Sequence, residues 1–274
     1  MSRLLAYMGS PILLSRAIIN HPYSLIEQSY APREMVTGTI NADGFGFGWY
    51  SELSDRPGTY HRSTPIWSDP DLPRIGRVIS SGCIFAAVRN ATPGFAVDLL
   101  NAPPYVHKHL LFLHNGAIEG FNHRFRNKLL KGISEEIQAT TLGSADSEVL
   151  FGLALTHLQK VRANAGDGTE ALKNALDHTL RRVLAIAGPE KARASLNMGL
   201  TDGHSMAFAR FARGIDPNSL YIRRDDGAVW VASEPLDDAD SWQEVPPDNW
   251  VLIEDPDSVS ILPISDLPPR RDWR

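Results

Sequence analysis

Apolar residues in the first part of the chain fall into short runs bounded by glycine, proline, asparagine or aspartate. Runs of this length with such boundaries are typical of buried β-strands rather than helices. The first part of the chain is therefore predicted to consist of strands joined by turns. The runs are RLLAYMG at 3–9, NADGFGFGWYS at 41–51, SGCIFAAVRN at 81–90 and HLLFLHNGAIEGF at 109–121.

The apolar positions take on a helical period in the middle of the chain. The segment 144–166 carries Asp146 near its start, where the helix dipole favours an acidic side chain. In the segment 167–189, Asp167 and Glu170 have the spacing of a capping box, and a Gly-Pro pair marks the end. Two long helices are therefore predicted. Their apolar stripes are Leu150, Leu153, Ala154, Leu158 and Val161 in the first and Leu172, Ala175, Leu176, Leu180 and Val183 in the second.

Beyond these helices the chain returns to strand runs, separated by turn signals such as Asp202-Gly203, Asp226-Gly227 and Asp255-Pro256. Strands, then a helical pair, then strands indicate an α+β domain with layered antiparallel sheets. We expect one domain over residues 1–264. The last residues, 265–274, are proline-rich and charged, and are predicted to form a loosely attached tail.

The composition and charge of the chain indicate which classes of binding partner to expect. With 43% apolar residues among 274, the chain can bury a sizeable core, and its formal charge of −5 comes without a basic stripe. Nucleic acid is therefore not expected as a partner. No apolar run reaches the length of about 18 residues that spans a membrane, and no signal peptide is recognised, so we expect a cytoplasmic protein without a membrane span. The single cysteine, Cys83, excludes a disulfide framework.

Three patterns suggest other chemistry but lack its context. The glycines at 44–48 are not followed by a helix that could cradle phosphate, so no dinucleotide site is predicted. His107, His109 and His114 lack carboxylates at ligand spacing, and we predict neither a metal site nor a cofactor. No G-x-S-x-G elbow occurs, which removes the usual internal serine nucleophile.

Four stretches in their order along the chain resemble the class II glutamine amidotransferases, which are N-terminal-nucleophile hydrolases. The stretches are Ser2 with its following strand, AAVRNATPG around Arg89, HNG at 114–116 and GSADSE around Asp146. Within that family the chain is most similar to the stand-alone γ-glutamyl amidohydrolases of ergothioneine biosynthesis, on QSYAPREM, NADGFGFGWY, VRNATPG and VWVASEPLDD. The resemblance implies a four-layer αββα sandwich of two antiparallel sheets between helices.

The resemblance also implies a role for each matching residue toward a small-molecule γ-glutamyl substrate. Removal of Met1 would expose the α-amine of Ser2, which could act as the base for its own hydroxyl nucleophile. Arg89 and Thr92 match the residues that hold the substrate α-carboxylate, and Asp146 matches the acid that holds its α-ammonium. Asn115, through its side-chain amide, and Gly116, through its backbone N–H, match the oxyanion hole. The glycine run at 44–48 would let backbone approach the nucleophile closely.

Each of these residues also has an ordinary structural interpretation. Arg89 could form a strand-end ion pair, Thr92 a turn, Asn115-Gly116 a tight turn, and Asp146 a helix cap.

The family's nucleophile is a cysteine, whereas this chain has Ser2. Three hypotheses follow: a working serine hydrolase, a γ-glutamyl or glutamine binding protein without catalysis, and a substrate-trapping variant. The short tail favours hydrolysis over ammonia transfer, with a separate synthase subunit as the alternative. The sequence predicts no oligomeric state.

Overall fold

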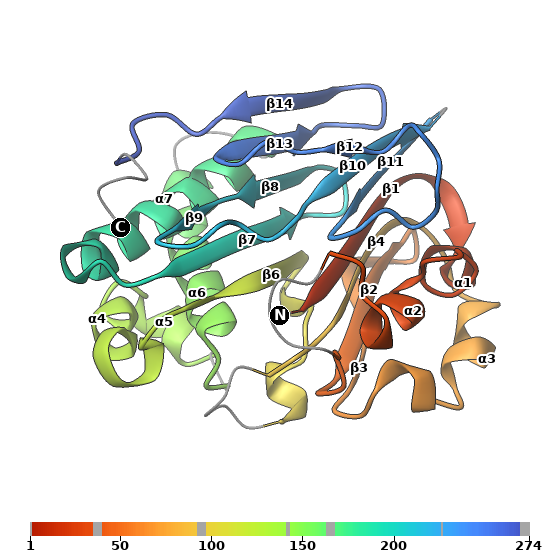
Figure 1. The fold of residues 1–274 in the computed structure, drawn as a ribbon, viewed down its shortest axis with the longest axis horizontal. Helices are drawn as coiled ribbons and strands as arrows, with labels where there is room; N and C mark the ends of the chain where they lie inside the picture. The colour runs from red at the N-terminus through yellow and green to blue at the C-terminus, as the bar shows by residue number, and fades with distance from the viewer. Residues whose placement is uncertain are drawn as a thin grey trace.

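The computed structural model describes residues 2–34, 40–91, 97–140, 143–162, 168–225 and 227–268. Within this part of the chain, two antiparallel sheets lie face to face and helices cover both outer faces (Figure 1). This arrangement confirms the predicted α+β class and the four-layer αββα sandwich.

The two sheets differ in the order of their strands. The first sheet has the spatial order β12-β10-β11-β1-β4-β2-β3, and the second has the order β14-β13-β8-β7-β6-β5, with β9 beside β7. The first sheet contains β1 (Arg3–Leu13), β2 (Phe45–Ser51), β3 (Ser54–Arg62), β4 (Ser80–Val88), β10 (Tyr221–Asp225), β11 (Ala228–Ala232) and β12 (Gln243–Glu244). The second contains β5 (Tyr105–His107), β6 (Leu110–Ile118), β7 (Ala194–Thr201), β8 (Met206–Arg210), β9 (Ala212–Arg213), β13 (Asn249–Ile253) and β14 (Val259–Pro263).

Helices of unequal length form the outer layers. The long helices α6 (Asp146–Arg162) and α7 (Thr169–Ala187) pack on the second sheet, whereas the short α1 to α3 pack on the first (Figure 1). The short helices and turns are α1 (Leu14–Ile18), α2 (Leu25–Tyr30), η1 (Ile66–Ser68), α3 (Leu72–Gly76), η2 (Leu99–Asn101), η3 (Phe121–Phe125), α4 (Arg126–Leu130), α5 (Glu135–Gln138) and η4 (Gly188–Glu190).

The continuous apolar runs of the central strands follow from burial on both faces. Along β1, Leu4 and Ala6 point into the core between the two sheets, whereas Leu5 and Tyr7 point into the core beneath the outer helices. Alternate side chains of a strand point to opposite faces. A strand with a core on each side therefore needs apolar residues at every position.

The long helices begin and end close to their predicted bounds, but one expected cap differs. The cap residue of α7 is Gly168, which offers no side-chain hydrogen bond, and Asp167 lies outside the described residues. The helix ends at Ala187, immediately before the Gly188-Pro189 pair, as predicted. The stripe residues of α7 are all buried, so its packing against the second sheet confirms the predicted apolar face.

Glycines in β2 allow the facing layer to approach. A Cβ atom on Gly46 would lie 2.4 Å from the backbone oxygen of Pro103, and one on Gly48 would lie 2.6 Å from the side chain of Leu111. Both contacts are far shorter than van der Waals distance. Gly46 and Gly48 thus accommodate residues of the opposite sheet and its loop. The expected approach of this run to Ser2 stays a prediction.

The predicted tail is attached where the structure describes it. Side-chain nitrogens of Arg181 donate to the backbone oxygens of Ser265 and Asp266 over 3.1 and 3.4 Å, and Arg213 donates to that of Pro268 over 3.1 Å. The boundary at residue 264 remains a prediction. None of the described helices combines the length and apolar character needed to cross a membrane.

Candidate active site

The topology brings the predicted site residues together from separate strands. β1 is a central strand of the first sheet, and its residue Arg3 lies opposite Val88 of β4. Ser2 and Arg89 therefore sit side by side where β1 begins and β4 ends. β6 of the second sheet, which carries Asn115 and Gly116, packs against both strands.

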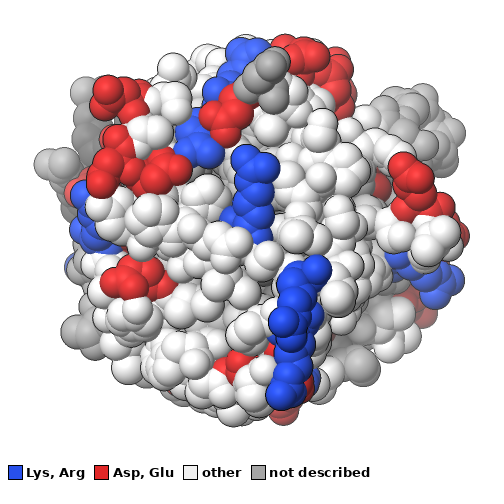
Figure 2. Space-filling model, turned by 90° about the vertical axis from the view of Figure 1, so that its right-hand side faces the viewer, with Lys and Arg blue, Asp and Glu red and all other residues white. Residues whose placement is uncertain are grey.

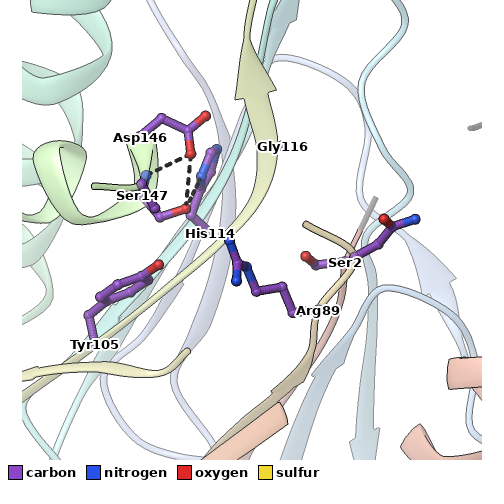
Figure 3. Close-up of a pocket in the computed structure, with 9 residues that line it drawn as sticks. Ser2, Arg89, Tyr105, His114, Gly116, Asp146 and Ser147 are labelled. Atoms are coloured by element: carbon purple, nitrogen blue, oxygen red, sulfur yellow. Dashed lines mark hydrogen bonds between the residues drawn. The ribbon is translucent and has the colours of Figure 1, made fainter. Parts of the chain in front are cut away.

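A small cavity lies at this junction. Its volume is about 30 Å³, close to that of one water molecule. Figure 3 shows Ser2 and Arg89 on one side and Asp146, Ser147 and His114 on the other. The described residues that line it are Ser2, Arg89, Asn90, Tyr105, His114, Gly116, Ala145, Asp146 and Ser147.

One predicted residue of the described part of the chain, Asn115, is not among those that line the cavity. Asn115 is fully buried beside it in β6, and Thr92 lies outside the described residues. Because Asn115 and Gly116 both lie within the strand β6, the tight-turn interpretation of this pair is wrong. Gly116 is also sterically required, since a Cβ atom there would lie 1.9 Å from the backbone oxygen of Ser195.

Asp146 is the first residue of α6 and is positioned by backbone donors. One carboxylate oxygen accepts from the N–H of Ser147 over 2.8 Å, and the other accepts from the N–H of Ile118 over 3.3 Å. The first contact satisfies part of the helix N-terminus, so the capping interpretation describes one of its roles. The carboxylate nevertheless faces the cavity and offers it negative charge.

His114 is a neutral ring that contacts Ser147, the residue next to Asp146. Its Nε2 lies 3.2 Å from the backbone oxygen of Ser195, which can only accept, so Nε2 carries the proton. Its Nδ1 then accepts from the hydroxyl of Ser147 over 2.9 Å. Burial lowers the pKa of His114, and the nearby Asp146 opposes that shift only in part.

Tyr105 also lines the cavity, to one side of Arg89 and Asp146 (Figure 3). Its hydroxyl donates to the backbone oxygen of Asn101 over 3.1 Å. Burial raises the pKa of Tyr105, the charge of Arg89 lowers it, and the charge of Asp146 raises it. A cationic and an anionic side chain thus act on the same ring, and a cavity lined by both is suited to the carboxylate and ammonium of an amino acid.

Ser233, at the end of β11, connects Asn115 to the strand of Ser2. Its hydroxyl oxygen accepts from the backbone N–H of Leu4 over 3.0 Å and from Nδ2 of Asn115 over 3.3 Å. The amide group of Asn115 is thus held against β1, two residues after Ser2.

A buried ion pair holds the same strand on its other face. Nε of Arg3 lies 2.7 Å from the carboxylate of Glu234, and both side chains are 1% exposed. Burial lowers the pKa of Arg3, and Glu234 opposes that shift. Glu234 also accepts from the backbone N–H groups of Arg33 and Glu34. It therefore connects the start of β1 to the loop after α2.

Other reactive groups in the described residues are not arranged for catalysis. Burial raises the pKa of the Cys83 thiol to about 12, as expected for a cysteine that packs as a small apolar residue. No group of three His, Cys, Asp or Glu side chains among the described residues is placed to hold a metal ion.

Sequence reasoning missed several residues that shape the site. His114 and Ser147 belong to the HNG and GSADSE stretches, and Ser233 to VWVASEP, so their motifs carried a signal that was not assigned to them. Tyr105 lies in none of the sequence motifs, so no signal pointed to it.

Three comparisons with known proteins agree on the family. A family model described as glutamine amidotransferases class-II matches residues 18–224. The γ-glutamyl-hercynylcysteine sulfoxide hydrolase of Mycobacterium tuberculosis is 30% identical over 246 residues, which cover 90% of each chain. The probable glutamine amidotransferase DUG3 of Saccharomyces cerevisiae is 30% identical over 306 residues, covering 97% of this chain and 85% of the relative.

A solved structure extends this agreement to the fold. The glutamine aminotransferase class-II domain protein of Silicibacter pomeroyi has a TM-score of 0.69 and 26% identity, and the match covers 96% of this chain and all of that one.

Proposed function

The chain belongs to the class-II glutamine amidotransferases, and from that premise we propose that it hydrolyses γ-glutamyl amides with Ser2 as its nucleophile. The observation that carries the proposal is the shared cavity: Ser2, Arg89 and Asp146, from three distant parts of the chain, line the same small space. A nucleophile, a cation and an anion are the groups needed to attack a γ-carbonyl and to hold the amino-acid end beyond it.

Binding rests on the two charged ends of the cavity. Arg89 would pair with the α-carboxylate of the glutamyl group, and Asp146 with its α-ammonium. Charge-assisted hydrogen bonds of this kind are roughly twice as strong as neutral ones.

The proposed chemistry starts once Met1 has been removed. The α-amine of Ser2, with an ordinary pKa of about 7.7 to 8.0, takes the hydroxyl proton as the oxygen attacks the γ-carbonyl. Asn115 and Gly116 stabilise the oxyanion. The C–N bond then breaks, the proton passes to the leaving amine, and the glutamyl ester on Ser2 is hydrolysed by water to glutamate.

We propose γ-glutamyl hercynylcysteine sulfoxide as the substrate, so that hercynylcysteine sulfoxide is the leaving amine. The support is the Mycobacterium tuberculosis relative, which matches along 90% of both chains. The yeast relative has the same identity under a different name, so the family supports the γ-glutamyl part more firmly than the amine.

One observation favours a second candidate, a γ-glutamyl binding protein. A serine hydroxyl depends on its base for reactivity, whereas the cysteine expected in this family is partly ionised near neutral pH. Arg89 and Asp146 would then bind the ligand without turnover.

The test is glutamate release, with γ-glutamyl hercynylcysteine sulfoxide, γ-glutamyl-p-nitroanilide and glutamine as substrates. Release that Ser2→Ala abolishes supports the hydrolase. Binding without release by the Ser2 chain, together with release by Ser2→Cys, supports the binding protein. If neither chain binds or cleaves any of the three, both functions are wrong.

A further inference from the structure

We propose that Asn218 is a positioning residue that fixes the side-chain amide of Asn115 with its NH2 group toward the strand of the nucleophile. Asn218 lies in the segment between β9 and β10, far from the predicted site in sequence. Its effect on catalysis rests on the proposed γ-glutamyl hydrolysis. The orientation itself rests on hydrogen bonds alone.

The first step fixes the amide of Asn218. Its Nδ2 donates to the backbone oxygen of Asn115 over 3.1 Å. A backbone oxygen can only accept, so the Asn218 atom at this place must be the nitrogen. The same Nδ2 lies 3.0 Å from the side chain of Asn115, and there it requires a second acceptor.

The second step follows for Asn115. Because Nδ2 of Asn218 is a donor, the Asn115 atom facing it must be Oδ1. The NH2 group of Asn115 is thereby turned the other way, toward the hydroxyl of Ser233 and the backbone of Leu4. One N–H of this amide contacts Ser233, and the proposed oxyanion role falls to its second N–H.

The third step shows that Asn218 is itself held. Its backbone oxygen accepts from Nδ2 of Asn197 over 2.9 Å and from Nε of Arg210 over 3.0 Å. Asn197 stands opposite Asn115 in the pairing of β6 with β7. Asn115, Asn197, Asn218 and Ser233 are at most 2% exposed, so water does not compete for these bonds.

The orientation matters because a reversed amide would present the wrong atom. Oδ1 of Asn115 would then point toward Ser233 and the nucleophile strand, where a carbonyl oxygen repels a forming oxyanion. Removing one oxyanion donor typically lowers turnover by about 100-fold to 1000-fold. Asn218 acts through this donor without contacting the substrate.

The decisive variant is Asn218→Asp, which keeps the shape of the side chain but removes its NH2 group. At a pH where the new carboxylate is ionised, it accepts from Asn115 and reverses that amide. We expect kcat to fall by about 100-fold, approaching Asn115→Ala, with KM nearly unchanged. The double variant that combines Asn218→Asp with Asn115→Ala should be no slower than Asn115→Ala alone, because both changes remove the same donor.

The matched control is Asn249→Asp, which removes an NH2 group that donates to Pro247 in an exposed turn of the second sheet. It should keep the wild-type kcat. The assays run in the Ser2 chain and in parallel in the Ser2→Cys background. Should Asn218→Asp fail to fold, Asn218→Ala removes the same donor without adding a charge, and its kcat is expected to fall by about 10-fold or more for the same reason.

Two results would overturn the inference. One is unchanged kcat in Asn218→Asp or, where that variant does not fold, in Asn218→Ala. The other is a loss in the double variant that adds in full to that of Asn115→Ala. If neither background cleaves a γ-glutamyl compound, the proposed function fails separately. The inference is then decided by atomic-resolution crystal structures, in which Asn115 must be reversed by Asn218→Asp and not by Asn249→Asp.

Discussion

At the scale of single residues, Asp146 is one of two Arg or Asp side chains among the described residues that line the cavity. Asp146 accepts two backbone N–H groups and has a single carboxylate to share with a ligand. Its structural role and its proposed binding role can be separated by removing its charge while keeping its shape.

Asp146→Asn should therefore weaken binding more than stability. The amide oxygen can still accept from one backbone N–H, but the ammonium of the substrate loses its ionic partner. Hydrogen bonds to charged groups contribute about 1.5 to 3 kcal/mol, so affinity for glutamate is expected to fall by about 10-fold to 100-fold. Calorimetric titration with glutamate measures this. Asp177→Asn, on the outer part of α7, is the control, and equal affinities in the two variants would contradict the assignment.

Cys83 gives a second test at this scale. Its thiol is 3% exposed and its pKa is raised to about 12 by burial, so the folded wild-type protein should resist alkylation at mildly alkaline pH. In Ser2→Cys, one thiol should react quickly. Mass spectrometry of the labelled peptides identifies it, and rapid labelling of Cys83 in the native wild type would show that this core region opens.

At the scale of elements, the sequence predicts best what is buried on both sides. β1, β4 and β6 were recognisable because each packs against a core on both faces, and α7 because its apolar stripe is regular. β3 was missed. It is an edge strand with a polar sequence containing proline and glycine, and its pattern resembles a loop.

The candidate site shows the same division. Ser2, Arg89, Asn115, Gly116 and Asp146 could be named because they stand in motifs whose order resembles a family. Asn218 could not, because it lies in an irregular segment and its partner is more than a hundred residues away. Only the folded chain brings such a residue to the site.

The packing of α7 on the second sheet predicts a clear difference between two leucine variants. Leu180 is fully buried in this interface, whereas Leu53 is 97% exposed. Leu180→Ala leaves a cavity and should lower the free energy of unfolding by about 2 to 5 kcal/mol. Leu53→Ala should change it by less than about 0.5 kcal/mol. Urea unfolding measures both, and similar losses would mean that α7 does not pack as described.

At the scale of the whole molecule, the proposed function depends on inner strands of two stacked sheets. β1, which follows the proposed nucleophile, and the end of β4 belong to the first sheet, and β6, which carries the proposed oxyanion residues, belongs to the second. On the face shown in Figure 2, acidic and basic side chains are scattered over a largely uncharged surface.

Buried histidines make the stability of the molecule depend on pH. Burial lowers the pKa of both His61 and His114, so the unfolded chain binds protons that the folded chain does not. Stability is therefore expected to be complete above the ordinary histidine pKa of about 6.5 and to fall as the pH drops below it. His114→Gln should flatten this slope. Thermal unfolding between pH 5 and 8 measures it, and identical slopes would contradict a buried neutral His114.

The central claim is that the residue exposed by loss of Met1 attacks a γ-glutamyl carbonyl. Intact-mass spectrometry tests it most directly, on Ser2 and Ser2→Cys proteins that both lack Met1, before and after incubation with γ-glutamyl hercynylcysteine sulfoxide or glutamine. The account predicts a glutamyl adduct on residue 2 together with released glutamate, reached faster in the cysteine chain. Two folded proteins that show neither adduct nor glutamate with any γ-glutamyl compound would contradict it.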